Sequence, residues 1–137
     1  MLPLSRCQIS LESLILWLAL AGMLAAFTPL VGNVLHAYAL QTQAQELAAF
    51  SARVQQSLNE LSFSGEGTQY LLHMPAFENV KMESSEHVVH FVMEDASLPV
   101  PKTFSIESPL PLSVNGVLEE GKWIIRRRAD GLEIEWK

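Results

Sequence analysis

The sequence SLILWLALAGMLAAFTPLVGNVL, residues 13–35, decides the fold of the first third of this chain. It contains 23 residues and no charged side chain. A hydrocarbon layer about 30 Å thick is crossed by roughly 20 apolar residues, because an α-helix rises about 1.5 Å per residue. Residues 13–35 therefore predict a single membrane-spanning helix.

The residues before this span do not form an ordinary secretory signal. Such a signal has an apolar stretch of about 7–15 residues followed by a small-residue cleavage site, whereas this stretch is longer and its unusual polar residues precede it. Glu12 stands at the edge of the span, where a carboxylate costs a few kcal/mol. A positive partner or the positive end of the helix dipole would offset that cost, the dipole by about 0.3–1 kcal/mol. Hydration of Glu12 at the headgroup level is the alternative.

The polar residues fit the pattern Q-x-S-x-E-x-x-x-L, formed by Gln8, Ser10, Glu12 and Leu16. This pattern resembles the class III signal peptide of archaeal type IV pilin-like proteins. The resemblance implies that a prepilin-type signal peptidase cuts between Cys7 and Gln8, so that residues 1–7 are a leader and the apolar helix stays on the mature protein. Cys7 stands where the family usually has glycine or alanine. In the family's filaments the glutamate pairs with the N-terminal amine of a neighbouring subunit.

Two residues inside the span favour a distortion of the helix. Pro29 removes one helix hydrogen bond and clashes with the preceding turn, which predicts a kink or local melting over residues 25–29. Gly22 is the second residue, and bacterial type IV pilins carry a glycine and a proline at similar places. Both residue types are also common in membrane helices, so the two interpretations stay open.

The basic residues predict the orientation of the span. The N-terminal amine and Arg6 precede it, and the next basic residue is Arg53. The positive-inside tendency then places the N-terminus in the cytoplasm and the rest of the chain outside.

After the span the helical pattern continues but becomes amphipathic. Apolar residues recur every three or four positions, as on one face of an α-helix, at Leu47, Phe50, Val54, Leu58 and Leu61. We expect one helix over residues 9–61, roughly 80 Å long, which the glycines of Gly65-Glu66-Gly67 end.

The remainder predicts a small β-rich head and hence an α+β fold similar to that of pilins. β-branched and aromatic stretches separated by proline and glycine turns predict strands at residues 68–74, 80–83, 87–94, 102–107, 112–118, 122–128 and 132–136. The punctuating turns include Asn115-Gly116, and the strands are expected to be antiparallel and to pack on the helix. The aromatic side chains predicted in the core are Phe77, Phe91, Phe104, Trp123 and Trp136.

The last two strands predict a hairpin with a two-residue Asp130-Gly131 turn. This turn places Arg128 opposite Glu133 and Arg126 opposite Glu135 on one face. The other face would carry Ile125, Leu132, Ile134 and Trp136, together with Arg127. Residues 126–128 could bind an anion, but the glutamates favour an ion-pair ladder.

No catalytic residue, cofactor site or metal site is expected. The net charge of −6 argues against nucleic-acid binding, and Cys7 is the single cysteine, so no intrachain disulfide is possible. His87 and His90 would point to opposite faces of a strand. The acidic pairs at residues 94–95 and 119–120 fit solvated turns.

These observations favour a structural protein with three parts: a leader at residues 1–7, a long helix at residues 8–62 and an extracellular head at residues 66–137. The predicted function is a pilin-like subunit, anchored in membrane lipid, that assembles with other pilin subunits into a surface filament. The resemblance implies a platform protein and an assembly ATPase as partners. The alternative is a pseudopilin-like or solitary anchored binding module that does not polymerise. Trp17 and Tyr38, near opposite ends of the span, fit the aromatic belts of a membrane helix.

Overall fold

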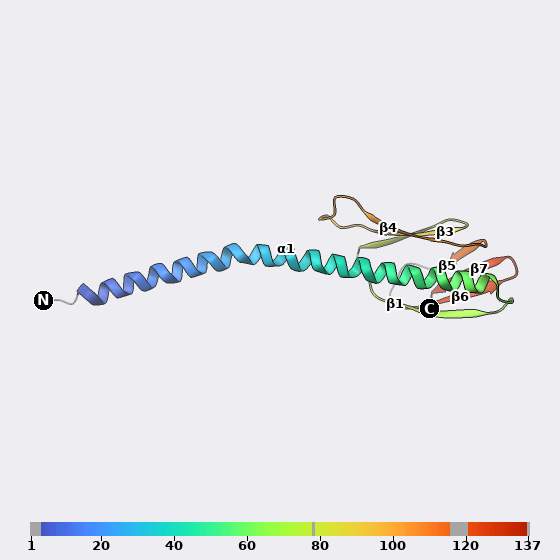
Figure 1. Cartoon of the computed structure of the whole chain (residues 1–137), viewed down its shortest axis with the longest axis horizontal. Coiled ribbons are helices and arrows are strands. Elements are labelled where there is room, and N and C mark those ends of the chain that lie inside the picture. Colours follow the sequence, from blue (N-terminus) through green and yellow to red (C-terminus); the bar gives the residue numbers. More distant parts are fainter. Residues whose placement is uncertain (1–3, 78, 116–120, 137) are drawn as a thin grey trace. The chain divides into compact units, whose positions relative to one another are not determined.

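The chain has an α+β layout, with one long helix followed by β-sheets (Figure 1). A computed structural model describes the backbone of residues 4–77, 79–115 and 121–136, and the side chains of the same residues from Ser10 onward. The elements are α1 (Leu4–Ser62), β1 (Gln69–Met74), β2 (Val80–Ser84), β3 (Val88–Met93), β4 (Lys102–Glu107), β5 (Leu112–Asn115), β6 (Gly121–Arg128) and β7 (Gly131–Trp136). The chain divides into two compact units, Met1–Gln41 and Thr42–Lys137. The predicted α+β layout is confirmed.

Helix α1 runs unbroken through Pro29. Proline has no backbone N–H, so the carbonyl of Ala25 loses its helical donor. One residue earlier, the Thr28 hydroxyl donates to the Leu24 carbonyl at 2.7 Å, a bond that often bends helices. Because residues 25–29 stay helical, a kink rather than local melting remains the expectation at this place.

The C-terminal part of α1 supplies one wall of the core of the second unit. The predicted apolar stripe is confirmed, because all five of its side chains are at most 3% exposed: Leu47, Phe50, Val54, Leu58 and Leu61. Since the compact unit begins at Thr42, the amphipathic part of the helix belongs to the head.

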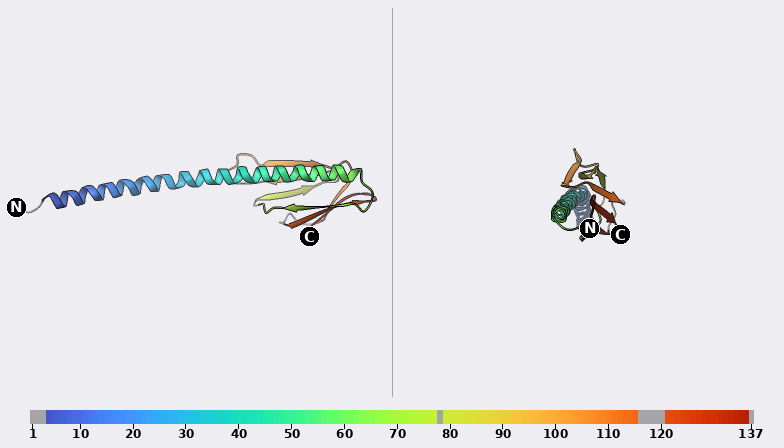
Figure 2. Two further views of the ribbon diagram at one scale, coloured as in Figure 1. Left: turned by 60° about the horizontal axis from the view of Figure 1, so that its bottom comes forward. Right: turned by 90° about the vertical axis from the view of Figure 1, so that its right-hand side faces the viewer.

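Two sheets pack against this helix segment. The larger has the strand order β1-β6-β7-β5 and the smaller the order β2-β3-β4. Figures 1 and 2 place the two sheets against different sides of the helix segment. Phe50 of α1 stands between them, with its ring centroid 5.9 Å from that of Trp123 in β6 and 6.0 Å from that of Phe91 in β3.

A glycine turn joins the helix to the larger sheet. The Thr68 N–H donates to the Gly65 carbonyl at 3.3 Å, and Gly67 between them has a φ of 87°. A positive φ at the third turn position is typical of a type II turn and favours glycine. The N–H of Gly67 donates to the Arg127 carbonyl, and the N–H of Arg127 donates to the Thr68 carbonyl. The pattern is that of a glycine β-bulge, which lets the chain leave the helix and enter β1.

One strand differs from the predicted antiparallel arrangement. β5 pairs with β7 in parallel, whereas the other paired strands are antiparallel. The chain reaches β5 from the smaller sheet, and the Leu112 N–H donates to the Glu86 carbonyl of that sheet's first hairpin at 2.7 Å. A tight hairpin forces two strands to be antiparallel, whereas a strand that arrives from another sheet can pair in either direction. The predicted turn at Asn115-Gly116 and the end of the predicted strand at residues 112–118 lie outside the described residues.

The predicted register of the β6–β7 hairpin is wrong, because each residue of β6 lies opposite a residue two positions earlier in β7 than predicted. Arg126 lies opposite Glu133 rather than Glu135, and Arg128 lies opposite Gly131. The turn therefore consists of residues 129–130, while Gly131 already belongs to the sheet. A Cβ on Gly131 would lie 2.2 Å from the Pro111 carbonyl oxygen. The glycine thus permits close approach of the chain before β5 and is not needed for a left-handed turn.

The faces of this hairpin agree with the prediction except at its end. Ile125, Leu132 and Ile134 are buried, and Trp123 and Phe91 are also core residues as predicted. Trp136 is 37% exposed, which corrects its assignment to the core. Its ring leans over Gly121, where an added Cβ would meet the indole. Phe77 and Phe104 are partly buried and pack against the core.

Candidate functional site

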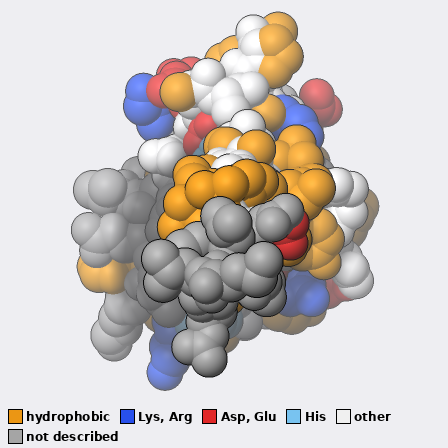
Figure 3. All heavy atoms as spheres, turned by 90° about the vertical axis from the view of Figure 1, so that its left-hand side faces the viewer, with side chains coloured by type: hydrophobic (Ala, Val, Ile, Leu, Met, Phe, Trp, Pro, Cys, Tyr) orange, Lys and Arg blue, Asp and Glu red, His pale blue; other side chains and the backbone are white. Residues whose placement is uncertain are grey.

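The most distinctive surface of the protein lies on the N-terminal unit. In helix α1 every side chain of residues 10–39 is exposed, and the large apolar ones are 49–71% exposed. Figure 3 views the molecule from the N-terminal end of the helix, and hydrophobic side chains lie together near the centre of that view. Among the described residues α1 is the one helix long and apolar enough to cross a membrane. An apolar surface of this extent marks an interaction with lipid or with other protein.

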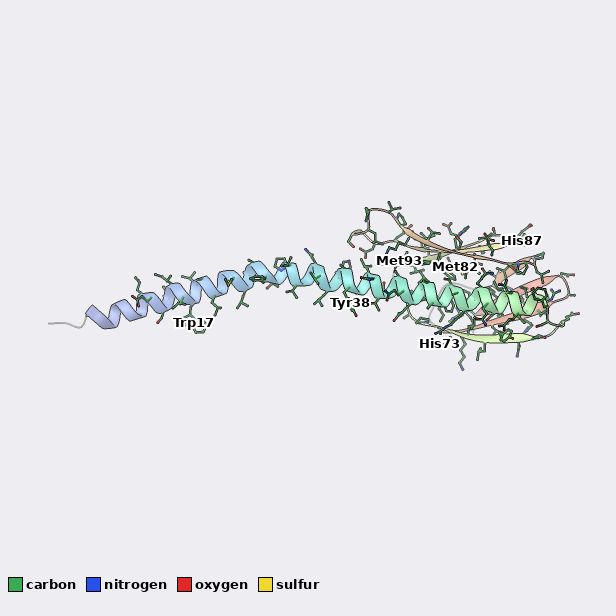
Figure 4. The ribbon with its side chains drawn as sticks, viewed as in Figure 1. Trp17, Tyr38, His73, Met82, His87 and Met93 are labelled. Carbon is green, nitrogen blue, oxygen red and sulfur yellow. The ribbon has the colours of Figure 1, made fainter. Side chains whose placement is uncertain are left out.

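Two aromatic residues bracket this surface. Trp17 and Tyr38 are 71% and 70% exposed, and both project from the helix (Figure 4). Their separation of 21 positions corresponds to about 32 Å along a helix axis. That distance matches a hydrocarbon core of about 30 Å, so both rings can reach the two interfaces where tryptophan and tyrosine are enriched.

The residues of the Q-x-S-x-E-x-x-x-L pattern lie on the first turns of α1. Glu12 and Leu16 are one helical turn apart on the same side, and both are exposed. Ser10 lies about 160° away from Glu12 around the helix. The backbone of Cys7 and Gln8 is helical, and their side chains are not among those that the structure describes.

Residues with small side chains lie along one side of the exposed helix. Ala19, Gly22 and Ala26 follow one another at three- and four-residue intervals, and Ala21 and Ala25 lie beside them. A Cβ added to Gly22 meets nothing within 4 Å. The glycine is therefore not required by the packing of the single chain. Small side chains on a membrane helix allow a second helix to come close.

Several polar side chains of the head form hydrogen bonds with one another. His90 Nδ1 is 2.8 Å from the Ser105 hydroxyl, and His73 and His87 lie on different sides of the head (Figure 4). No group of three histidine, cysteine or acidic side chains suited to a metal ion occurs among the described residues. Asp95 accepts hydrogen bonds from the N–H and hydroxyl of Ser97, which closes a turn. The second predicted acidic pair, at residues 119–120, lies outside the described residues.

Each sheet carries an ion pair on its outer surface. Lys81 and Glu94 are 2.6 Å apart, and the hydrogen bond to Glu94 raises the pKa of Lys81. Arg128 and Glu133 are also 2.6 Å apart, so this predicted pair forms, although diagonally. Among the described residues no ion pair joins Arg126 to Glu135, the predicted second rung, and Arg126 lies opposite Glu133 instead.

Two polar contacts of the head had no sequence signal. Arg127, placed on the core face by the alternation, turns its Nη1 to the carbonyls of Arg128 and Gly131 at 2.7 and 2.9 Å. The Gln55 side chain donates to the Glu107 carbonyl at 2.6 Å and accepts from the Glu107 N–H at 2.8 Å. It thereby pairs with the edge of β4 as a neighbouring strand would. Its partner lies 52 positions away in the chain, so no local sequence pattern indicates this contact.

Comparison with known proteins identifies no relative. No protein-family model matches the chain, and neither a curated protein nor a solved structure resembles it to a significant degree.

Proposed function

We propose that this protein is a type IV pilin-like structural subunit, anchored in a membrane and assembled into a surface filament through its N-terminal helix. The observation that supports the proposal is the exposed apolar surface of residues 13–35, which directly follows the motif residues Gln8, Ser10 and Glu12. An ordinary secretory signal is removed with its apolar stretch. A cut between Cys7 and Gln8 keeps that stretch on the mature chain.

In this proposal the apolar helix has two successive environments. It first lies in lipid, where it needs about 20 apolar residues and no partner. It then exchanges lipid contacts for contacts with neighbouring helices, which the small residues Ala19, Gly22 and Ala26 make favourable through close packing. The head stays outside the cell. The partners are the signal peptidase, other subunits, a platform protein and an assembly ATPase.

Glu12 gives the assembly its register. Removal of residues 1–7 creates a new amine at Gln8, and Glu12 is the fifth residue of the mature chain. A carboxylate inside a packed bundle of apolar helices needs a positive partner, and the amine of an adjacent subunit can supply it. If Gln8 cyclises, the amine is lost, and the Ser10 hydroxyl of a neighbour becomes the donor.

Labelling of a Ser84→Cys variant on intact cells tests the location of the head. Ser84 is exposed at the end of β2. Because Cys7 is the single cysteine and leaves with the leader, the mature variant contains one thiol. We expect a membrane-impermeant maleimide to label the variant on intact, surface-stripped cells and to leave the mature wild-type protein unlabelled.

The same cells also distinguish a filament from an anchored module. Mechanical shearing should release labelled protein in a filament fraction that sediments at high speed. Labelled protein that stays wholly in the membrane would favour the non-polymerising module. Labelling that requires cell lysis would place the head in the cytoplasm and contradict the proposal.

A further inference from the structure

Strand β1 leaves one edge of the larger sheet open. It is the first strand in the order β1-β6-β7-β5, and no described strand lies beyond it. The Arg127 N–H donates to the Thr68 carbonyl at 2.8 Å, so the even-numbered residues of this segment form the hydrogen bonds with β6. Hydrogen bonding alternates along an antiparallel ladder. The backbone groups of Gln69, Leu71 and His73 therefore point away from the sheet.

The other sheet edges among the described residues are protected. The Gln55 side chain occupies the edge of β4 at Glu107. β2 carries charged residues, and β5 is four residues long and donates to the Glu86 carbonyl from Leu112. Charges, short strands and covering groups are the usual means by which native proteins block edges. β1 has the sequence QYLLHM, without charge or proline, and its Leu71 is 62% exposed.

The face beside the open edge has an apolar centre and a basic surround. Leu71 lies opposite Ile124, while the flanking positions of β6 on the same face carry Lys122 and Arg126. Glu133, which lies opposite Arg126, pairs with Arg128, and no ion pair of Lys122 or Arg126 occurs among the described residues. Glu133 and Glu135 stand on β7, on the side of β6 away from the edge.

The opposite face of β1 is already engaged. Leu72 packs against the core and Met74 is buried. The Tyr70 hydroxyl bonds to Glu60 of α1, and this hydrogen bond raises the pKa of Tyr70. The strand is thus held in place, and a strand added at the edge would meet fixed backbone groups.

We propose that β1 binds an extended segment of a partner protein, which adds a fifth strand to the sheet and carries an apolar residue between two acidic ones at alternate positions. The apolar residue packs beside Leu71, and the acidic residues lie beside Gln69 and His73, across which the Lys122 and Arg126 side chains of β6 can reach them. Strand addition of this kind takes its affinity from main-chain hydrogen bonds and its specificity from alternate side chains. The inference goes beyond the proposed filament function and depends on neither processing nor assembly.

Charge excludes a second copy of the chain as the preferred occupant. Antiparallel pairing of two β1 strands about Leu71 would place Gln69, Leu71 and His73 of the two copies side by side, with Lys122 and Arg126 of each copy on the strand behind. β1 itself contains no acidic residue that could compensate them.

Peptide binding to the full chain in lipid nanodiscs tests the proposal. The probes are two fluorescein-labelled peptides with blocked termini, TETVTET and the charge-reversed TKTVTKT. Each acidic side chain reaches Lys122 or Arg126 across the intervening strand β1, and two such exposed charge pairs that change from attractive to repulsive correspond to about a tenfold difference in Kd. We expect the acidic peptide to bind at least about tenfold more tightly by fluorescence polarisation. A Lys122→Glu/Arg126→Glu variant should reverse this preference.

Two further measurements locate the binding. Leu71→Pro removes an N–H that points away from β6, so it should keep the fold and lose the acidic peptide, whereas Val100→Pro, at a side chain 69% exposed, should bind as the wild type does. Amide exchange over residues 69–73 should slow when the peptide is bound. Should Leu71→Pro fail to fold, the charge-reversal variant and the exchange data decide.

Three results would overturn the inference. The first is equal binding of the two peptides by the wild type and by the charge-reversal variant. The second is unchanged binding by a folded Leu71→Pro. The third is protection of residues 69–73 that rises with protein concentration in the absence of peptide, because a second copy of the chain would then occupy the edge.

Discussion

Replacing Glu12 with leucine is expected to abolish surface filaments and to leave membrane insertion and the fold of the head unchanged. Insertion should become easier, because a charge at the edge of the bilayer is removed. Within a filament the neighbouring amine would lose its acceptor. Removing one partner of a buried ion pair costs about 3–5 kcal/mol, and each 1.4 kcal/mol is about tenfold in an equilibrium constant. The yield of sheared filaments relative to cleaved membrane protein should fall roughly a hundredfold or more.

Ser13→Leu is the matched control for Glu12→Leu. It introduces the same apolar side chain at the next position and keeps the carboxylate, so we expect filament yield to stay near that of the wild type. A normal filament yield from Glu12→Leu would reject the pairing role. Equal loss in both variants would show that the effect comes from the added leucine and not from the lost charge.

Replacing Phe50 with alanine is expected to destabilise the head more than any surface change. The ring is 3% exposed and contacts Phe77, Phe91 and Trp123. The indole Nε1 of Trp123 is buried and has no hydrogen-bond partner among the described residues, so that side chain depends on its ring contacts. Truncation of a buried phenylalanine costs about 3–5 kcal/mol. A small domain has roughly 5–15 kcal/mol in total.

Near-ultraviolet circular dichroism of the full chain in detergent micelles measures this effect. One kcal/mol shifts Tm by about 4–8 °C in a domain of 60–100 residues, so Phe50→Ala should lower Tm by at least about 12 °C. Phe63→Ala removes the same side chain from a position that is 93% exposed and should leave Tm unchanged. Similar Tm values for the two variants would contradict the assignment of Phe50 to the centre of the core.

The elements of this fold could be predicted from local patterns in the sequence. The three- and four-residue spacing from Leu47 to Leu61 identified the buried face of α1, and the alternation of Ile125, Leu132 and Ile134 identified the core face of the last hairpin. These signals are local because helix and strand periodicity are properties of neighbouring residues. The exposed apolar span of residues 13–35 could also be predicted from a local pattern, because it is a continuous run without charged side chains.

Long-range contacts could not be predicted in this way. Gly131 was assigned to a turn because Asp-Gly is a strong hairpin signal, but the close approach of the Pro111 carbonyl gives it another role. The contact between Gln55 and Glu107 and the parallel direction of β5 likewise depend on residues far apart in the chain. The open edge of β1 follows from the strand order, which no local pattern contains.

We propose that the mature protein keeps its apolar helix and begins at Gln8, and an intact-mass measurement of the protein extracted from membranes and from sheared filaments tests this directly. We expect a chain that lacks residues 1–7 and contains no cysteine, with a further loss of about 17 Da if Gln8 has cyclised to pyroglutamate with release of ammonia. An intact N-terminus, or a chain that begins after residue 35, would contradict it.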